Sequence, residues 1–246
     1  MQLEVCASTP VDVAMALEAG ADRVELCAHW ECGGLTPSSA SIRASASLDI
    51  PVRVLVRPRA GHFVYNASER SLILSESMDC MEAGADKVVV GGLTEEGELD
   101  YALMEMLVDA VGAEKIVMHR ALDLSSDPMG AADALIDMGV REVLTSGGAS
   151  AAGLGLDLIR ELSGAGMEVI AGGGVRAEDV VALGESGVSV VHASCRVQEK
   201  LELSVVDSDK MKLFDLQTSP VDYRKVESLV NAVYNWNASS EDIDEE

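Results

Sequence analysis

One phrase recurs along this sequence: a helical segment stopped by glycine, followed by a short run rich in β-branched residues. Residues 19–22 (AGAD) lead into 23–26 (RVEL), and residues 83–86 (AGAD) lead into 87–90 (KVVV). Three more copies follow Gly139, Gly166 and Gly187. Glycine ends helices because it adopts the left-handed conformation without strain, and β-branched runs favour strands. The phrase therefore predicts alternating helices and strands.

Three further strands without the glycine signal bring the expected number to eight. The expected strands are 3–7, 23–26, 51–58, 87–90, 114–121, 141–144, 168–170 and 189–191. The expected helices are 10–19, 38–48, 68–82, 100–110, 128–138, 153–163, 177–185 and 222–235. Strict alternation predicts a parallel sheet. A doubly wound open sheet is the alternative, but eight near-equal units in 246 residues favour a closed (β/α)8 barrel of the TIM type.

These units leave two segments outside the repeat. Residues 196–221 are polar and lack a strong pattern, so we interpret them as a long connection before the last helix. Residues 238–246 (ASSEDIDEE) resemble a frayed acidic tail. We therefore expect one barrel domain over residues 1–237, followed by the tail.

The charge balance excludes several classes of partner. The net charge is −24, from 42 acidic and 18 basic residues, and this field repels nucleic acids and anionic membranes. No apolar run approaches the roughly 20 residues that span a membrane. The first residues carry Glu4 where a signal peptide needs a positive charge. Five scattered cysteines without a CxxC motif indicate free thiols in a reducing compartment, so we expect a cytoplasmic protein.

Unusually polar residues stand at the carboxyl ends of the expected strands, where barrel enzymes build their sites. Side chains alternate along a strand, so Glu4 shares a face with Cys6, Glu25 with Cys27, Arg57 with Arg59, and His192 with Ser194. If these faces point inward, charged groups are buried, which is costly unless they are paired. The pattern predicts either a functional site or a structural network of ion pairs.

Two sets of candidates follow from these strand ends. In an enzyme, the acid, base or assisting catalyst would be Glu4, Glu25 or His119. The glycine run 172–174 precedes a helix and permits either close approach of a phosphate or an ordinary tight turn. The ligand-binding candidates are Arg57, Arg59, Asp123, Ser146, Gly173, Gly174, His192 and Ser194.

The cysteines suggest a different chemistry. Cys6 and Cys27 each follow a glutamate by two residues on strands expected to be neighbours, ~4.8 Å apart, so their thiols could lie side by side. Thiolates select Cu(I) or Zn over hard cations. The alternative is that both are small buried hydrophobes, which is our interpretation of Cys80 in mid-helix. Cys32 and Cys195 are possible additional ligands.

Several motifs, in order over residues 3–195, resemble the CutC family of copper homeostasis proteins. They are 4–6 (EVC), 20–27 (GADRVELC), 33–38 (GGLTPS), 57–59 (RPR), 119–121 (HRA), 127–128 (DP), 143–147 (VLTSG), 171–175 (AGGGV) and 192–194 (HAS). The resemblance implies a (β/α)8 barrel, a cytoplasmic location, homo-oligomers, and Cu(I) binding through the cysteines that match Cys6 and Cys27.

The sequence departs from the family pattern at three places. Cys32 stands where the family has Glu, residues 60–62 (AGH) replace Gly-Gly-Asp, and Met118 replaces Phe. These changes suggest a rim richer in soft ligands than is usual.

Three functions remain open. The first is Cu(I) binding through Cys6 and Cys27. The second is a barrel enzyme acting on a small anionic metabolite, including phosphorylated ones, in which Arg57 and Arg59 hold the anion. The third is a scaffold without a small-molecule site, which the polar strand ends disfavour.

Overall fold

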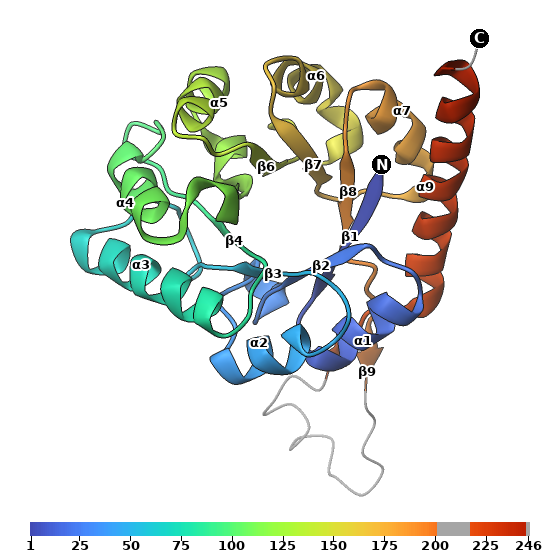
Figure 1. Ribbon diagram of the computed structural model, residues 1–246, viewed down its shortest axis with the longest axis horizontal. Coiled ribbons are helices and arrows are strands. Elements are labelled where there is room, and N and C mark those ends of the chain that lie inside the picture. The colour runs from blue at the N-terminus through green and yellow to red at the C-terminus, as the bar shows by residue number, and fades with distance from the viewer. Residues whose placement is uncertain (201–216, 245–246) are drawn as a thin grey trace, which may run out of the picture.

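The predicted barrel is confirmed by a computed structural model, which describes residues 1–200 and 217–244 (residues 200 and 241–244 by their backbone alone). Eight parallel strands pair in sequence order and close when β8 pairs with β1, with His192 opposite Glu4. The strands are β1 Gln2–Ala7, β2 Arg23–Leu26, β3 Val52–Leu55, β4 Lys87–Val90, β5 Ile116–Met118, β6 Glu142–Thr145, β7 Glu168–Gly172 and β8 Val190–Ala193. Helices surround them (Figure 1).

Eight helices in the described part of the chain lie near the expected ranges, although α6 and α7 begin three residues later than expected and α9 runs past its expected end at residue 235. They are α1 Pro10–Glu18, α2 Ser39–Ala46, α3 Ala67–Glu82, α4 Tyr101–Val111, α5 Pro128–Asp137, α6 Leu156–Gly164, α7 Val180–Glu185 and α9 Tyr223–Asp244. The Thr9 hydroxyl accepts the Asp12 N–H at the start of α1, at 3.1 Å. Gly20 and Gly84, after α1 and α3, have φ angles of 92° and 103°, the left-handed conformation that stops a helix.

Some expected elements are shorter than the sequence indicates. The strand expected over 114–121 is reduced to β5, because 3-10 turns at Ala113–Lys115 and Arg120–Leu124 flank it. The helix expected from residue 153 begins at Leu156, after a 3-10 turn that contains Gly153, and glycine is a poor helix former. Sequence periodicity does not distinguish a tight 3-10 turn from the end of a regular element.

The segment before α9 is described only at its two ends. There β9, Glu199–Lys200, pairs antiparallel with β10, Gln217–Thr218, and Arg196 forms a bridge with Val221. The remainder of the expected connection, residues 201–216, lies outside the described residues. Helix α9 then packs beside α7 and β1 (Figure 1). It runs to Asp244, into the segment expected to be a tail, whose residues 245–246 lie outside the description.

The barrel interior has two zones. At the amino end of the strands, buried charges pair: Arg23 Nε lies 2.8 Å from Glu4, and Arg53 and Lys87 both bind Glu142. A second buried cluster inside the barrel is apolar and consists of Cys6, Cys27, Leu55, Val89, Val117, Leu144, Ile170 and Val190. These charges therefore form a structural ion-pair network, and Glu4 is the candidate from the sequence that belongs to it.

Candidate functional site

Two thiols meet at the carboxyl end of the barrel. The sulfur atoms of Cys6 on β1 and Cys27, just after β2, lie 3.8 Å apart, and both side chains are buried. The Ser8 hydroxyl lies 3.9 Å from the Cys27 sulfur. The hydrogen bond between Cys6 and Cys27, together with burial, raises the Cys6 pKa well above its ordinary value. The same bond lowers the Cys27 pKa. Cys27 is therefore the thiol that ionises first, and while both thiols are protonated either sulfur can donate to the other.

A histidine with two carboxylates lies beside the thiols. His192 on β8 binds Glu4 through Nδ1 at 2.8 Å, and its Nε2 lies 3.7 Å from Glu25. Burial opposes the charge on His192, but the hydrogen bond to Glu4 and the charge of Glu25 outweigh it, so the His192 pKa is raised. Burial would raise the Glu4 pKa too, yet His192, Arg23 and Arg53 lower it to about 2.

Glu4 and Glu25 thus have different roles. One oxygen of the Glu4 carboxylate binds Arg23 and the other binds His192, which fixes the orientation of the imidazole. Glu25 has a pKa raised by burial and lines the cavity above the barrel, as a general acid or base would. Among the described residues, ligand atoms of Cys6, Glu25 and His192 lie within 4.8 Å of one another, which is the spacing of a metal-ligand cluster.

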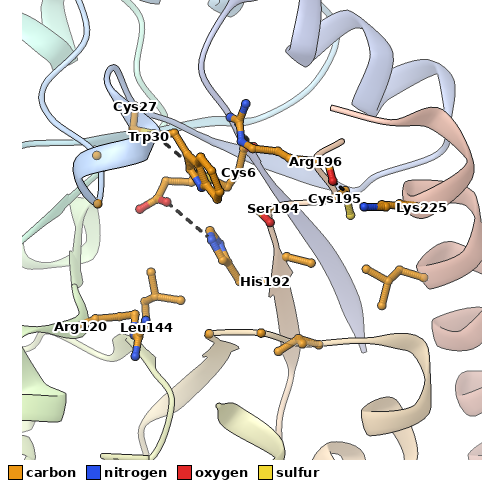
Figure 2. Close-up of a pocket in the computed structure, with 18 of the residues that line it drawn as sticks. Cys6, Cys27, Trp30, Arg120, Leu144, His192, Ser194, Cys195, Arg196 and Lys225 are labelled. Atoms are coloured by element: carbon orange, nitrogen blue, oxygen red, sulfur yellow. Dashed lines mark hydrogen bonds and ion pairs between the residues drawn. The ribbon is translucent and has the colours of Figure 1, made fainter. Parts of the chain in front are cut away.

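A cavity of about 800 Å³ opens over this cluster. Leu55, Leu144, Phe63 and Trp30 supply apolar lining, and Gly173, Gly174 and Ser194 come from the ends of β7 and β8. Figure 2 shows Cys6, Cys27 and His192 approaching one another in it. A volume of this size is typical of small-molecule sites, which span roughly 300–1,000 Å³.

His119 lies on another side of the cavity with one nitrogen unpartnered. The Ala121 N–H donates to Nδ1 at 3.3 Å, so the neutral ring carries its hydrogen on Nε2. Burial, reinforced by the charge of Arg57, lowers the His119 pKa to about 4. Its buried Nε2 has no hydrogen-bond partner among the described residues. The neutral His119 ring therefore keeps one buried N–H that lacks an acceptor among the described residues.

The two arginines expected to hold an anion serve mainly to shape loops. Arg57 lines the cavity, but its guanidinium donates to the carbonyl oxygens of Cys32, Gly33, Gly34 and Gly61. Arg59 binds Glu69 at 2.5 Å and the carbonyls of His62 and Val64, and it is not among the residues that line the cavity.

Asp123 and Ser146 also lie outside the cavity lining. The Asp123 carboxylate accepts hydrogen bonds from Thr145 Oγ1 at 2.5 Å, Ser146 N at 3.0 Å and Gly148 N at 3.1 Å, and it pairs with Arg120 at 2.8 Å. The Ser146 hydroxyl accepts from Arg120 at 2.9 Å. This web holds the loop after β6 in place, and through Arg120 it touches the cavity.

We expect Asp123→Asn to lower the free energy of unfolding by about 2 kcal/mol, because the amide nitrogen turns a donor toward groups that need an acceptor. Urea unfolding measures the change. Asp133→Asn, an exposed position on α5, should stay within about 0.5 kcal/mol of the wild type. A neutral Asp123→Asn would show that water replaces the carboxylate.

The other cysteines differ from the pair. Cys195 lines the cavity, and burial raises its pKa to about 11. Cys32 is exposed, and its thiol donates to the His29 carbonyl at 3.1 Å without lining the cavity. Cys80 lies on α3 and is buried in the core, as expected of a small hydrophobe.

Sequence reasoning missed the residues that close the cavity from α9, which are Arg224, Lys225, Ser228 and Leu229. It also assigned His192 and Glu25 separately from the thiols, although all belong to one cluster. The order of β8, β1 and β2 around a closed barrel was the available signal, since it makes the carboxyl ends of these strands neighbours. No local pattern reveals that α9 reaches the barrel mouth.

Comparison with known proteins supplies a family. Residues 1–197 match the model of the CutC family. A family protein CutC of Glaesserella parasuis is 35% identical over 216 residues, which cover 86% of this chain and 89% of that protein. One from Pectobacterium atrosepticum is 41% identical over 197 residues, 78% of each chain.

Solved structures agree with the fold. A CutC structure from Streptococcus agalactiae, assigned to copper homeostasis by name, has a TM-score of 0.73 at 30% identity and covers 78% of this chain and 97% of that one. A structure of KGPDC from Streptococcus mutans, at 12% identity and a TM-score of 0.60, shares the fold alone. Of the helices described here, none has the length and apolar character to cross a membrane.

Proposed function

The chain belongs to the CutC family, and from this premise we propose that it binds Cu(I) through the paired thiols of Cys6 and Cys27. The observation that carries the proposal is the 3.8 Å separation of the two sulfur atoms in a buried site. Two thiolates that share one ion at ~2.3 Å with tetrahedral angles lie about 3.8 Å apart, so the spacing suits a single bridging metal. Thiolate softness favours Cu(I) or zinc among the common ions.

His192 and Glu25 complete the donor set. Glu4 holds Nδ1 of His192, which leaves Nε2 directed toward Glu25 and the thiols, as a carboxylate does for metal-ligating histidines. His192 must lose its proton before it ligates, and so must the thiols, so we expect binding to release protons and to weaken in acid. The free cysteines support a reducing, cytoplasmic location. Homo-oligomerisation stays a prediction.

An anaerobic Cu(I) competition titration against a chelator of known affinity tests the proposal. Wild type should bind one equivalent, and Cys6→Ala/Cys27→Ala should bind at least a hundredfold more weakly, because truncation removes both soft ligands. Cys32→Ser is the matched control, since its thiol is exposed and lies outside the cavity lining. Equal binding by the double variant and the wild type would contradict the proposal, and a parallel titration with Zn(II) identifies the preferred metal.

The cavity favours a second candidate function, an enzyme that acts on a small anionic metabolite. A single ion needs far less than 800 Å³, whereas an organic ligand would fill this volume beside the thiols. In this function Glu25 acts as acid or base, and the Nε2–H of His119 polarises an acceptor atom of the substrate. Glu4 acts as the positioning residue for His192.

A further inference from the structure

The cavity reverses the charge balance of the protein. The chain has 18 basic and 42 acidic residues, but among the described residues that line the cavity six are Arg or Lys and two are Glu. The basic residues are Arg57, Arg120, Arg176, Arg196, Arg224 and Lys225. Since the net charge of −24 repels anions from the surface at large, this concentration of cations makes the cavity mouth the local exception.

Three of these cations are already engaged within the fold. Arg57 donates to four loop carbonyls, as described above. Arg120 binds Asp123 and Ser146. Arg196 donates to the Cys6 carbonyl at 3.1 Å and the Ser8 hydroxyl at 2.7 Å, and it lies 5.2 Å from the ring centroid of Trp30. Their positions follow from structural hydrogen bonds, so they do not by themselves indicate a ligand.

The other three stand at the rim with their charges largely free. Arg176 is 75% exposed and lies 3.4 Å from an equally exposed Glu178, a weak pairing in water. Arg224 is exposed and has no side-chain partner among the described residues. Lys225 donates one hydrogen bond to the Arg196 carbonyl, at 2.5 Å (Figure 2). These residues, which we call the rim cations, keep donors for a ligand.

Two residues that line the cavity also carry buried donors without acceptors. Nε2 of His119 and Nε of Arg57 are both buried without a partner among the described residues, and both residues line the cavity. Their side chains are 3% and 6% exposed. A buried donor without an acceptor costs about 1–3 kcal/mol, so a ligand that offers an acceptor there gains affinity.

The rim lies partly outside the segment that defines the family. The family model ends at residue 197, whereas Arg224 and Lys225 belong to α9, Tyr223–Asp244. The thiol pair, Glu25 and His192 all lie within the family segment. Two of the three rim cations, Arg224 and Lys225, therefore come from outside the segment that holds the metal cluster, whereas Arg176 lies within it.

We propose that Arg176, Arg224 and Lys225 form a subsite for the phosphate group of a small organic phosphate, whose remainder extends toward His119. This inference rests on the second candidate function and names its substrate class. A phosphate dianion offers three acceptor oxygens, which suits three basic side chains that line one cavity. The cavity has the volume of a small-molecule site, and the net charge of −24 repels a nucleic-acid backbone.

Calorimetric titration with inorganic phosphate, and with glycerol 3-phosphate beside glycerol, tests the subsite. Arg176→Gln/Arg224→Gln should weaken phosphate binding at least tenfold. The matched control, Arg43→Gln/Arg141→Gln, removes the same charge from exposed positions away from the cavity and should bind like the wild type. Glycerol should not bind. Equal losses of phosphate affinity in both double variants would overturn the proposal, because the effect would then come from net charge alone. A wild type that does not bind phosphate would overturn it as well.

Two further readouts separate this inference from the functions on which it builds. Malonate, a dicarboxylate, distinguishes the substrate class: if it binds in a rim-dependent way and phosphate does not, the anionic ligand stands and the phosphate assignment fails. If neither anion binds, both the subsite and the second candidate function fail. Cu(I) affinity should be the same in the rim variant and the wild type, since no rim cation belongs to the thiol cluster.

Discussion

Replacing Arg53 by Met is expected to lower the free energy of unfolding by about 3–5 kcal/mol, the usual cost of breaking a buried ion pair. The Arg53 side chain is 5% exposed, binds Glu142, and lies 3.5 Å from Glu4. Its removal leaves Glu142 with Lys87 as its remaining cation in the network. Urea unfolding at pH 7 measures the loss.

The double variant Arg53→Met/Glu142→Met should be less destabilised than the sum of the two single variants, because it removes both charges and leaves apolar groups to pack. Lys87 is 22% exposed and can turn toward water, while Glu4 keeps Arg23 and His192. Arg160→Met is the surface control, since its partner Asp157 is fully exposed. If Arg53→Met costs no more than this control, water must screen the network.

The second large effect is a loss of stability in mild acid caused by His119. The folded protein holds the His119 pKa at about 4, against 6.5 for the ordinary side chain. Below pH 6.5, His119 is protonated in the unfolded chain but stays neutral in the folded protein until the pH reaches about 4. The contribution is therefore complete above pH 6.5 and is lost as the pH falls, by roughly 3 kcal/mol in total.

His119→Asn should remove this dependence. The Asn carbonyl can still accept the Ala121 N–H, but the side chain does not titrate. The difference in unfolding free energy between wild type and variant should shrink by roughly 3 kcal/mol between pH 7 and pH 4. His29→Asn serves as the control, because His29 is 66% exposed and Asn tolerates its φ of 50°. Parallel pH profiles for wild type and His119→Asn would show that His119 is hydrated rather than dry.

Both effects reflect a division of labour inside one barrel. The lower charges, such as Arg53 and Glu142, hold the strands together and do not line the cavity. The upper groups, such as Cys27 and His119, line it and retain unused donors or soft ligands. We therefore expect Arg53→Met to change stability without changing Cu(I) affinity in the protein that remains folded.

Local sequence signals were sufficient for the architecture. Gly20 and Gly84 stop helices because only a residue without a side chain adopts their φ angles freely, and the β-branched runs after them form strands in any barrel of this kind. Alternation along β1 and β2 was also enough to bring Cys6 and Cys27 to one face. Where the sequence overstated an element, as at 114–121, the error came from 3-10 turns that carry no periodic signal.

The role of each polar residue was a different matter, because hydrogen-bond partners come from distant parts of the chain. Asp123 and Arg59 carry the same functional groups as cavity residues. Loop amides, however, already donate hydrogen bonds to the Asp123 carboxylate, and Arg59 is already paired with Glu69. Local signals in the sequence were enough to predict the barrel, and the two-residue period of strands left the thiol pair as one of two alternatives that the 3.8 Å separation of the sulfur atoms resolved. Which charges pair with one another and which stay free depends on packing between distant segments, as when α9 lines the cavity after packing against β1 and α7.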